Sequence, residues 1–317
     1  MEAENRDRSG NLAALRARAA ECIEPLIEMA LAEDIGPGDI TTDMLVDPEA
    51  RGVAYLVARE HGVVAGLVFV EAVLRHVDEE LEFHPAAKDG SPVRPNQVLG
   101  EIHGPLRAAL TAERTVLNFL QALSGIATIT RKFVDAVAGT GAKIYDTRKT
   151  TPGWRSLEKY AVRMGGGQNH RTGLHDAILI KDNHLACHAN STRPVAVADI
   201  VRLARSRAPK GMPVQVEVER LEQLAVVLQA KPDVILLDNM TLVQLREAVR
   251  RRNAIQSAKR PRLEASGGIN LRKVRNVAET GVDRISVGAL THSAPALDLA
   301  MEITSLTPAR KPRKGRG

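Results

Sequence analysis

The apolar positions near the amino end follow the period of an α-helix. Ile23, Leu26, Ile27, Ala30 and Leu31 recur at intervals of three and four, which predicts a helix that buries one face. The helix is expected to end at the Gly-Pro-Gly of residues 36–38, because glycine and proline interrupt helical backbone. The first 20 or so residues are predicted to form a frayed or extended lead-in to this helix.

Short apolar segments follow, and they predict a compact α+β unit of roughly 100 residues. One short helix is expected at residues 71–77. Strands are expected at residues 52–60, 63–70, 81–87 and 97–104. A long helical pattern then runs over residues 111–139, with Gly125 as its expected kink or break.

From residue 142 onward the rhythm changes to strands that alternate with helices. These strands are continuous runs of Val, Ile and Leu, which are typical of parallel strands covered on both faces. The strands are expected at residues 142–146, 177–182, 213–219, 233–239, 262–268 and 283–289. Amphipathic helices are expected at residues 197–208, 241–253 and 271–281. A doubly wound sheet and a closed barrel both fit this rhythm.

The ends of these strands favour the barrel. Each strand ends in a polar or glycine group, and a barrel would bring all of these ends to one mouth, where barrel enzymes place their sites. An open sheet would spread them along an edge. The groups are Asp146 with Arg148, Lys181 with Asp182, Glu217, Asp238, Ser266 with Gly267, and Gly288.

Composition and charge narrow the class of protein. Of the 317 residues, 44% are hydrophobic and 3% aromatic, so the core is aliphatic and a stacking platform for nucleic acid is disfavoured. The formal charge of +6 comes mostly from residues 309–317, which we interpret as a basic, disordered tail. Cys22 and Cys187 lack metal-ligand spacing, which favours a reducing compartment. With no long apolar run and a polar start, the chain is expected to be cytoplasmic.

The expected mouth has a cationic set of side chains. Arginine binds carboxylate or phosphate through two N–H groups, and lysine adds a point charge, so this set predicts a polyanionic ligand. The set consists of Arg148, Lys149, His170, Arg171 and Lys181, with His184 and His292 as further candidates.

Two carboxylates and three glycine-rich segments complete the expected site. Glu217 and Asp238 end consecutive strands, where they could hold Mg²⁺ on a phosphorylated substrate or stabilise a developing positive charge. The glycine-rich segments are residues 165–171, 265–269 and 286–293. The second of them feeds a helix and so offers backbone N–H groups and a helix N-terminus to a phosphate.

Each motif also has a plain structural interpretation. Residues 146–153 could be an exposed turn, residues 165–171 a flexible loop, and residues 265–269 an ordinary turn before a helix. Glu217 and Asp238 could cap helices or pair with lysine. The functional interpretation is favoured because these unrelated turns would otherwise all be polar at the same end of the barrel by chance.

The motifs together resemble the quinolinate phosphoribosyltransferase family, also called nicotinate-nucleotide pyrophosphorylase (carboxylating). The resemblance covers about residues 24–306. It rests on DTRKTTPG, KYAVRMGGGQNHRTGLHDAILIKDNH, VQVEVE, VILLDN, EASGGI and GVDRISVGALTHS, with EDIGPGDITT and AERTVLNFLQALSGIAT nearer the amino end.

The resemblance implies an α/β fold with two domains. Residues 21–125 would form an α/β sandwich domain, and residues 126–293 an incomplete α/β barrel of seven strands. An incomplete barrel explains why the sequence predicts fewer than the eight strands of a complete one. An extension at residues 1–20, a helix at residues 294–308 and the tail at residues 309–317 complete the expected organisation.

The resemblance also implies a reaction and an assembly. Quinolinate would accept the phosphoribosyl group of phosphoribosyl pyrophosphate and lose CO2, giving nicotinate mononucleotide and pyrophosphate in NAD biosynthesis, with Mg²⁺ as cofactor. The assembly would be an obligate homodimer with shared active sites, alone or within a hexamer.

Carried over residue by residue, the resemblance assigns a role to each candidate. Arg148, His170, Arg171 and Lys181 would contact the quinolinate carboxylates, and Arg114 would reach in from the partner subunit. Phosphoribosyl pyrophosphate and its metal would be held by Lys149, Glu217, Asp238, Ser266, Gly267, Gly268, Gly288 and His292. Lys149, Glu217 and Asp238 would stabilise charge, and the two carboxylates would bind Mg²⁺ directly or through water.

Three other functions fit parts of the sequence. A relative with a changed acceptor, such as the molybdenum-transport-associated homologues, is disfavoured because Arg148, His170 and Arg171 are all present. A different phosphoribosyltransferase is disfavoured because the usual acidic-pair loop ending in Thr-Gly is absent. Nucleic-acid binding would depend on the basic tail alone.

Overall fold

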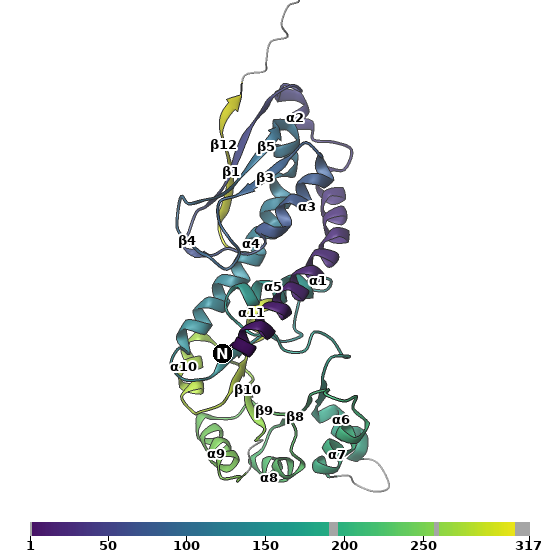
Figure 1. Ribbon diagram of the computed structural model, residues 1–317, viewed down its shortest axis with the longest axis vertical. Helices are drawn as coiled ribbons and strands as arrows, with labels where there is room; N and C mark the ends of the chain where they lie inside the picture. Colours follow the sequence, from purple (N-terminus) through teal and green to yellow (C-terminus); the bar gives the residue numbers. More distant parts are fainter. Residues whose placement is uncertain (1, 190–195, 257–259, 308–317) are drawn as a thin grey trace, which may run out of the picture. The chain divides into compact units, whose positions relative to one another are not determined.

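The computed structural model describes residues 2–189, 196–256 and 260–307, with the backbone alone for residues 2–11, 188–189 and 304–307. The chain divides into two compact units (Figure 1). The first consists of Met1–Ile129, Thr151–Gly166 and Ala294–Gly317, and the second of Thr130–Thr150 and Gly167–Ser293. The predicted basic tail lies outside the described residues, as does most of the segment from 186 to 196.

The first unit is built on an antiparallel sheet with the strand order β12-β1-β5-β3. Its strands are β1 (Arg51–Ala58), β3 (Glu82–Pro85), β5 (Val98–Pro105) and β12 (Leu299–Thr307), beside the short pair β2 (Gly62–Val63) and β4 (Pro92–Val93). Its helices are α1 (Glu2–Ile35), α2 (Ile40–Leu45), α3 (Leu67–Val77), α5 (Arg155–Met164) and most of α4 (Leu106–Ala136).

Helix α1 buries the predicted apolar face but begins much earlier than expected. Ile23, Ile27 and Leu31 are buried, and the same spacing of four continues backward through Ala19 and Leu15, which are buried as well. The apolar face therefore stabilises helix where the sequence had predicted a frayed or extended lead-in. That prediction is wrong for the described part of residues 1–20.

The strand predicted at residues 63–70 is mostly wrong. Only Gly62–Val63 pairs as a strand; residues 64–66 are irregular, and residues 67–70 form the start of helix α3. Val70, Val73 and Leu74 are buried on one face of that helix. Helical spacing across the whole segment therefore outweighs the β-branched composition of its first half.

The helix predicted at residues 294–308 is also wrong. Residues 299–307 form β12, which pairs antiparallel with β1. Leu297 and Leu299 are buried while Asp298 between them is exposed, which is the alternation of an extended chain. Because β1 would otherwise be an unpaired edge, its free N–H and C=O groups favour pairing with this segment.

Helix α4 is not broken at Gly125. The glycine is required for close packing, since a Cβ at this position would lie 2.0 Å from the carbonyl oxygen of Pro295. The sequence therefore indicated correctly that Gly125 has a structural role. That role is a close contact with a distant segment and not a break in the helix.

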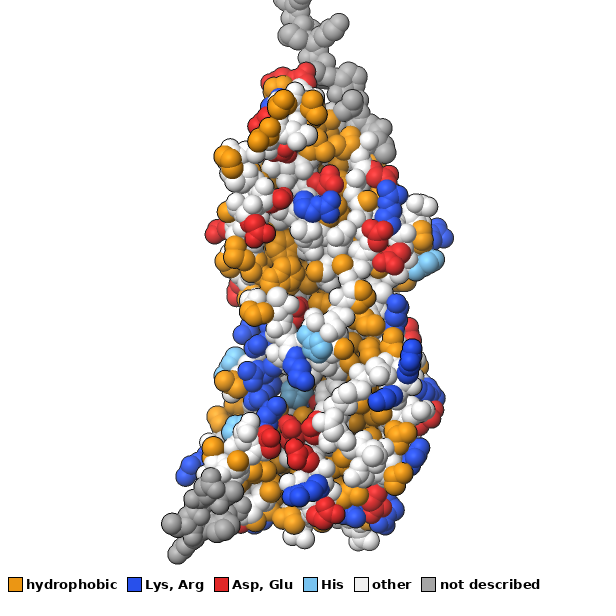
Figure 2. All heavy atoms as spheres, turned by 180° about the vertical axis from the view of Figure 1, so that it is seen from behind, with side chains coloured by type: hydrophobic (Ala, Val, Ile, Leu, Met, Phe, Trp, Pro, Cys, Tyr) orange, Lys and Arg blue, Asp and Glu red, His pale blue; other side chains and the backbone are white. Residues whose placement is uncertain are grey.

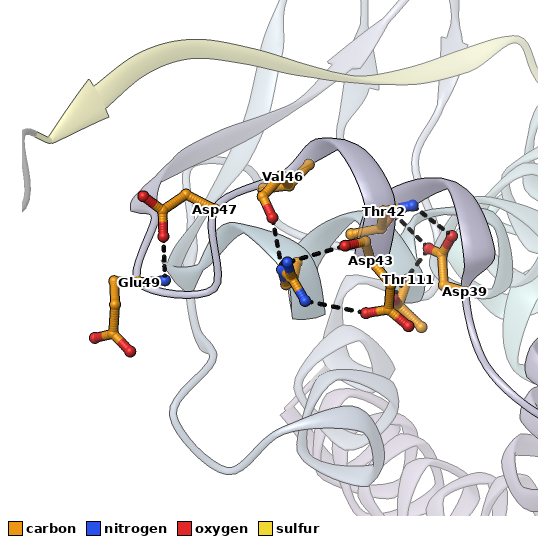
Figure 3. Close-up of polar contacts among 8 residues, drawn as sticks. Asp39, Thr42, Asp43, Val46, Asp47, Glu49 and Thr111 are labelled. Atoms are coloured by element: carbon orange, nitrogen blue, oxygen red, sulfur yellow. Dashed lines mark hydrogen bonds and ion pairs between the residues drawn. The ribbon is translucent and has the colours of Figure 1, made fainter.

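Polar contacts fix α2 against the start of α4 (Figure 3). The carboxylate of Asp39 accepts the hydroxyl of Thr42 at 2.6 Å and the N–H of Thr42 at 3.0 Å. The hydroxyl of Thr111 on α4 donates to the same carboxylate at 3.1 Å. These bonds, led by the Thr42 hydroxyl, hold the pKa of Asp39 below its usual value. The EDIGPGDITT motif is thus tied to the first turns of the helix that carries Arg114.

The second unit contains all six strands that the sequence predicted. They form a parallel sheet in the order β6-β11-β10-β9-β8-β7. The strands are β6 (Lys143–Tyr145), β7 (Ile178–Ile180), β8 (Val214–Val218), β9 (Val234–Asp238), β10 (Arg262–Ser266) and β11 (Arg284–Ser286). The helices are α6 (Asp182–Ala189), α7 (Val197–Arg207), α8 (Leu221–Ala230), α9 (Leu242–Asn253), α10 (Leu271–Ala278) and α11 (Ala289–His292).

The pairing of these strands determines where their ends lie. Neighbouring strands of this sheet pair in parallel, so their carboxyl ends lie on the same side of the sheet. Gln168 forms a further parallel bridge to Tyr145 beside β6. Across the described residues, no helix has the length and apolar character needed to cross a bilayer.

Candidate active site

A cavity of about 650 Å³ opens at the carboxyl ends of the strands and is lined by the second unit alone. Its walls show a period of two along four of the six strands, because alternate side chains of a strand face the same side. The lining pairs are Leu179 and Lys181, Leu236 and Asp238, Glu264 and Ser266, and Ser286 and Gly288. The convergence predicted from the polar strand ends is therefore confirmed.

The cavity gathers most of the candidate residues of the second unit. They are Arg148, Lys149, His170, Arg171, Lys181, Glu217, Asp238, Ser266, Gly267, Gly268, Gly288 and His292. His184 is not among the lining residues, and its Nδ1 accepts the N–H of Lys181 at 2.9 Å. Arg114 belongs to the first unit, where 58% of its side chain is exposed.

Arg148 and Arg171 bring two guanidinium groups into the cavity. Arg171 donates one N–H to the carbonyl oxygen of Ala177 at 3.1 Å. The buried Nε atoms of Arg148 and Arg171 have no hydrogen-bond partner within the described residues. Burial, followed by repulsion from Arg148, lowers the pKa of Arg171. Buried donors without partners cost free energy, so the pair is suited to accept a carboxylate or phosphate.

Asp146 fixes the glycine-rich segment that carries His170. Its buried carboxylate accepts the Nδ2 of Asn169 and the backbone N–H of His170, each at 2.7 Å. Gln168 exchanges backbone hydrogen bonds with Ile144 and Asp146 at 2.8 and 3.0 Å. Gln168 therefore extends the edge of the sheet and Asp146 holds the next two residues, so the alternative of a flexible loop does not hold for residues 168–170.

Glu217 and Asp238 place two carboxylates on neighbouring strands. Oε2 of Glu217 lies 3.7 Å from Nζ of Lys181. Asp238 accepts the Ser266 hydroxyl at 2.7 Å and the side-chain amide of Asn239 at 2.8 Å. Burial raises the pKa of Glu217, Lys181 opposes that shift, and Asp238 adds to it. Two carboxylates that repel each other are suited to bind a cation between them.

The donor set fits Mg²⁺ that arrives with a phosphorylated ligand. In the described residues, no group of three or more His, Cys, Asp or Glu side chains could hold a metal ion. Mg²⁺ is commonly bound by one or two carboxylates together with substrate phosphates and water. Glu217 and Asp238 provide that number of carboxylates at the cavity wall.

The turn after β10 requires glycine. Gly267 has φ +93° and Gly268 φ +58°, and a Cβ on Gly267 would lie 2.1 Å from Oδ1 of Asn239. The turn leads to Asn270, whose side chain caps α10 by accepting the N–H of Lys273 at 3.2 Å. A glycine turn that lines a cavity ahead of a helix N-terminus is suited to bind phosphate.

Glu264, Ser286 and Asn239 also line the cavity, although the sequence did not predict them as site residues. The prediction rested on the last residue of each strand and not on the residue two positions earlier. Glu264 precedes Ser266 by two residues, so the alternation of strand faces was the signal that could have found it.

These features define a class of protein. Basic, histidine and acidic side chains lie close together on the surface of the second unit (Figure 2). Guanidinium pairs, carboxylates and glycine turns at the ends of parallel strands form an enzyme-type site for phosphorylated and carboxylated ligands.

The chain belongs to the quinolinate phosphoribosyltransferase family. The model of the N-terminal domain of this family matches residues 39–124, and that of the C-terminal domain matches residues 126–302. Together these matches cover most of the chain.

Individual relatives agree with that membership. The chain is 45% identical to the nicotinate-nucleotide pyrophosphorylase [carboxylating] of Mycobacterium leprae, over 87% of this chain and 95% of that protein. Among solved structures, it is similar to the nicotinate-nucleotide pyrophosphorylase of Francisella tularensis, with 37% identity and a TM-score of 0.82 over 90% of this chain and 97% of the other. NadC from Streptococcus pyogenes gives 40% identity and a TM-score of 0.82, over 90% and 96% of the two chains.

Proposed function

We propose that this protein transfers the phosphoribosyl group of phosphoribosyl pyrophosphate to quinolinate, with loss of CO2, to form nicotinate mononucleotide and pyrophosphate in NAD biosynthesis. The observation that carries the proposal is the cavity itself. Within it, paired guanidinium groups with free donors lie with two carboxylates and a glycine turn. A dicarboxylate and a phosphorylated sugar match these three features. The chain also belongs to the quinolinate phosphoribosyltransferase family.

The two substrates would occupy different parts of the cavity. Quinolinate would lie at the cationic wall formed by Arg148, His170, Arg171 and Lys181. Phosphoribosyl pyrophosphate would be bound by the other candidates that line the cavity, which are Lys149, Glu217, Asp238, Ser266, Gly267, Gly268, Gly288 and His292. This division is the one that the family resemblance implies, and it agrees with guanidinium groups as donors to a carboxylate and backbone N–H groups as donors to a phosphate.

The first chemical step breaks the bond between the ribose carbon and pyrophosphate. Mg²⁺, held by Glu217 and Asp238 directly or through water, would neutralise charge on the pyrophosphate. Lys149 would support the leaving group. The two carboxylates would also stabilise positive charge on the ribose, and at about 4 Å and an effective dielectric near 20 one carboxylate interacts with a unit charge by about 4 kcal/mol. The clamped ring nitrogen of quinolinate then attacks from a fixed distance.

The second step needs little from the protein. Once the ring nitrogen is bonded to ribose it is cationic and withdraws electrons from the neighbouring carbon. The carboxylate on that carbon can therefore leave as CO2, and a proton takes its place. The guanidinium groups would hold the remaining carboxylate while this occurs.

We further propose the assembly and architecture that the resemblance implies. The second unit would be an incomplete barrel of seven strands, with the backbone at Gln168 supplying the seventh beside β6. The first unit would correspond to the α/β sandwich domain, and the protein would act in the cytoplasm as a homodimer, alone or within a hexamer. The free thiols of Cys22 and Cys187 support a reducing compartment.

The direct test is incubation of the purified protein with quinolinate, phosphoribosyl pyrophosphate and Mg²⁺, followed by mass spectrometry. Nicotinate mononucleotide is expected from quinolinate and not from nicotinate, because nicotinate lacks the second carboxylate that the clamp requires. Absence of product from folded, assembled protein would overturn the proposal. Formation of product with nicotinate but not with quinolinate would mean that the protein uses a different acceptor.

A subunit-mixing experiment tests the proposed role of Arg114. If Arg114 completes the site of the partner subunit, mixing the inactive variants Arg114→Ala and Lys181→Ala is expected to restore part of the activity. The reason is that one of the two sites in a mixed dimer then carries both intact residues. Exchange of subunits is verified by mass spectrometry of differently labelled chains. Exchange without recovery would mean that Arg114 and Lys181 serve the same subunit.

A further inference from the structure

Glu264 is a buried carboxyl group that the proposed chemistry does not use. It lies in the middle of β10 with no exposed surface, and it lines the cavity between two basic side chains. One oxygen lies 3.6 Å from Nε2 of His170, and the other lies 3.8 Å from the guanidinium of Arg284. Both neighbours are themselves largely buried, with 7% and 17% of their side chains exposed.

The surroundings of Glu264 set its charge. Burial raises its pKa to about 7, Arg284 and the hydroxyl of Ser286 oppose that shift, and Asp146 adds to it. Arg284 is held in place from the other side, where its guanidinium lies 4.6 Å from the centre of the Tyr145 ring. The charged and titratable groups around Glu264 are thus Arg284 from β11, His170 from the segment before β7, and Asp146 after β6.

The imidazole of His170 has a defined orientation between two protein groups. Its Nδ1 accepts the backbone N–H of Arg171 at 2.9 Å, so Nδ1 carries a lone pair and not a proton. Its Nε2 is buried and lies 3.6 Å from a carboxyl oxygen of Glu264, an ion-pair distance that is too long for a hydrogen bond. Because Nδ1 is an acceptor, the neutral ring carries its proton on Nε2, the nitrogen beside this carboxyl group.

This arrangement links Glu264 to Arg171. Glu264 lies beside the ring of His170, and the ring accepts the backbone N–H of the next residue, whose guanidinium lines the cavity. Asp146 fixes the backbone of His170 from the other side through a bond of 2.7 Å. The position of one guanidinium therefore depends on a carboxyl group that does not need to touch the substrate.

We propose that Glu264 is a positioning residue for the carboxylate-binding half of the cavity: it keeps His170 in the Nε2-protonated form and thereby places Arg171. The identity of the carboxylate as quinolinate rests on the proposed function. The positive charge of this half then comes from Arg148, Arg171 and Lys181, and His170 contributes through the geometry of Arg171.

The first test observes the ring of His170 in the free protein. With ¹⁵N-labelled histidine, the signals of His170 are identified by their absence in His170→Asn. The nitrogen shifts are expected to show Nε2 protonated and Nδ1 unprotonated near neutral pH. The opposite tautomer in the wild-type protein would overturn the proposal. This measurement needs no Glu264 variant and no substrate.

The second test changes Glu264. In Glu264→Met the ring of His170 is expected to lose its single tautomer, because no acceptor faces Nε2. The KM for quinolinate is expected to rise about tenfold, while that for phosphoribosyl pyrophosphate changes by less than about twofold. Glu264→Gln keeps an oxygen that can accept from Nε2, so it is expected to recover the tautomer and most of the quinolinate affinity.

Gln215→Met is the matched control. Gln215 is a buried polar residue of β8, in the same sheet, and it does not line the cavity. The same change there is expected to leave both KM values as they are. An equal rise of both KM values in Glu264→Met, or an unchanged His170 tautomer, would overturn the proposal. If the wild-type protein forms no nicotinate mononucleotide, the proposed function is wrong. The nitrogen shifts of His170 in the wild type and in Glu264→Met then still decide the role of Glu264.

Discussion

Replacing Asp238 with asparagine is expected to lower kcat by about 100- to 1000-fold without unfolding the protein. The carboxylate would stabilise positive charge on the ribose and bind Mg²⁺, and both contributions depend on its negative charge. Asparagine has nearly the same shape, and its oxygen can still accept the hydroxyl of Ser266, which now donates to Asp238 at 2.7 Å. The effect on kcat therefore measures charge and not packing. Steady-state rates at saturating substrates and Mg²⁺ give the comparison.

The matched control is Asp233→Asn. Asp233 precedes the same strand at its other end, where its carboxylate accepts the N–H of Val214 at 2.9 Å and Arg205 at 2.7 Å. The same chemical change there is expected to alter stability and leave kcat unchanged. An unchanged kcat in Asp238→Asn would remove this residue from the charge-stabilising set.

Replacing Arg148 with alanine is expected to weaken quinolinate binding by about 1.5–3 kcal/mol, the size of a hydrogen bond to a charged group. This corresponds to roughly 10- to 150-fold in the dissociation constant. The buried Nε of Arg148 has no hydrogen-bond partner in the described structure, so a bound carboxylate would supply one. Phosphoribosyl pyrophosphate is expected to bind nearly as well as before, because its proposed contacts other than Lys149 lie on other strands. Calorimetric titration of each ligand measures the two affinities.

Arg246→Ala serves as the control for charge alone. Arg246 is exposed on α9 and is not among the residues that line the cavity. Its loss removes the same charge from the protein and is expected to leave both affinities unchanged. If Arg148→Ala weakened the two ligands equally, Arg148 would act through the general potential of the cavity and not as a quinolinate clamp.

The candidate site could be predicted largely from the sequence because each strand carries its polar residue at its end. Asp238 and Ser266 come directly after apolar runs, and parallel pairing places them in register on adjacent strands. Glu264 could not be recognised in the same way. It lies within an apolar strand beside Leu263 and Ala265, and only its spacing of two residues from Ser266 indicates the face it occupies.

Two of the errors in the fold have a common physical cause. The spacing of apolar residues predicted the later part of helix α1 correctly. Residues 299–307, in contrast, form a strand because β1 offers them an edge for pairing. Gly125 marked a close contact with Pro295 and not a break in the helix. In each case a partner far away in the chain decided the conformation, and the local sequence does not specify that partner.

The sequence by itself determined the six parallel strands, the amphipathic helices, the family and the residue types of the site, because these depend on hydrophobic periodicity and on local motifs. Only the tertiary structure decided which of these residues meet. It placed His170 between Arg171 and Glu264, which come from separate segments, and left the buried Nε atoms of Arg148 and Arg171 without hydrogen-bond partners among the described residues. Distances between segments and the burial of charge arise from packing, and packing is fixed only when the whole chain has folded.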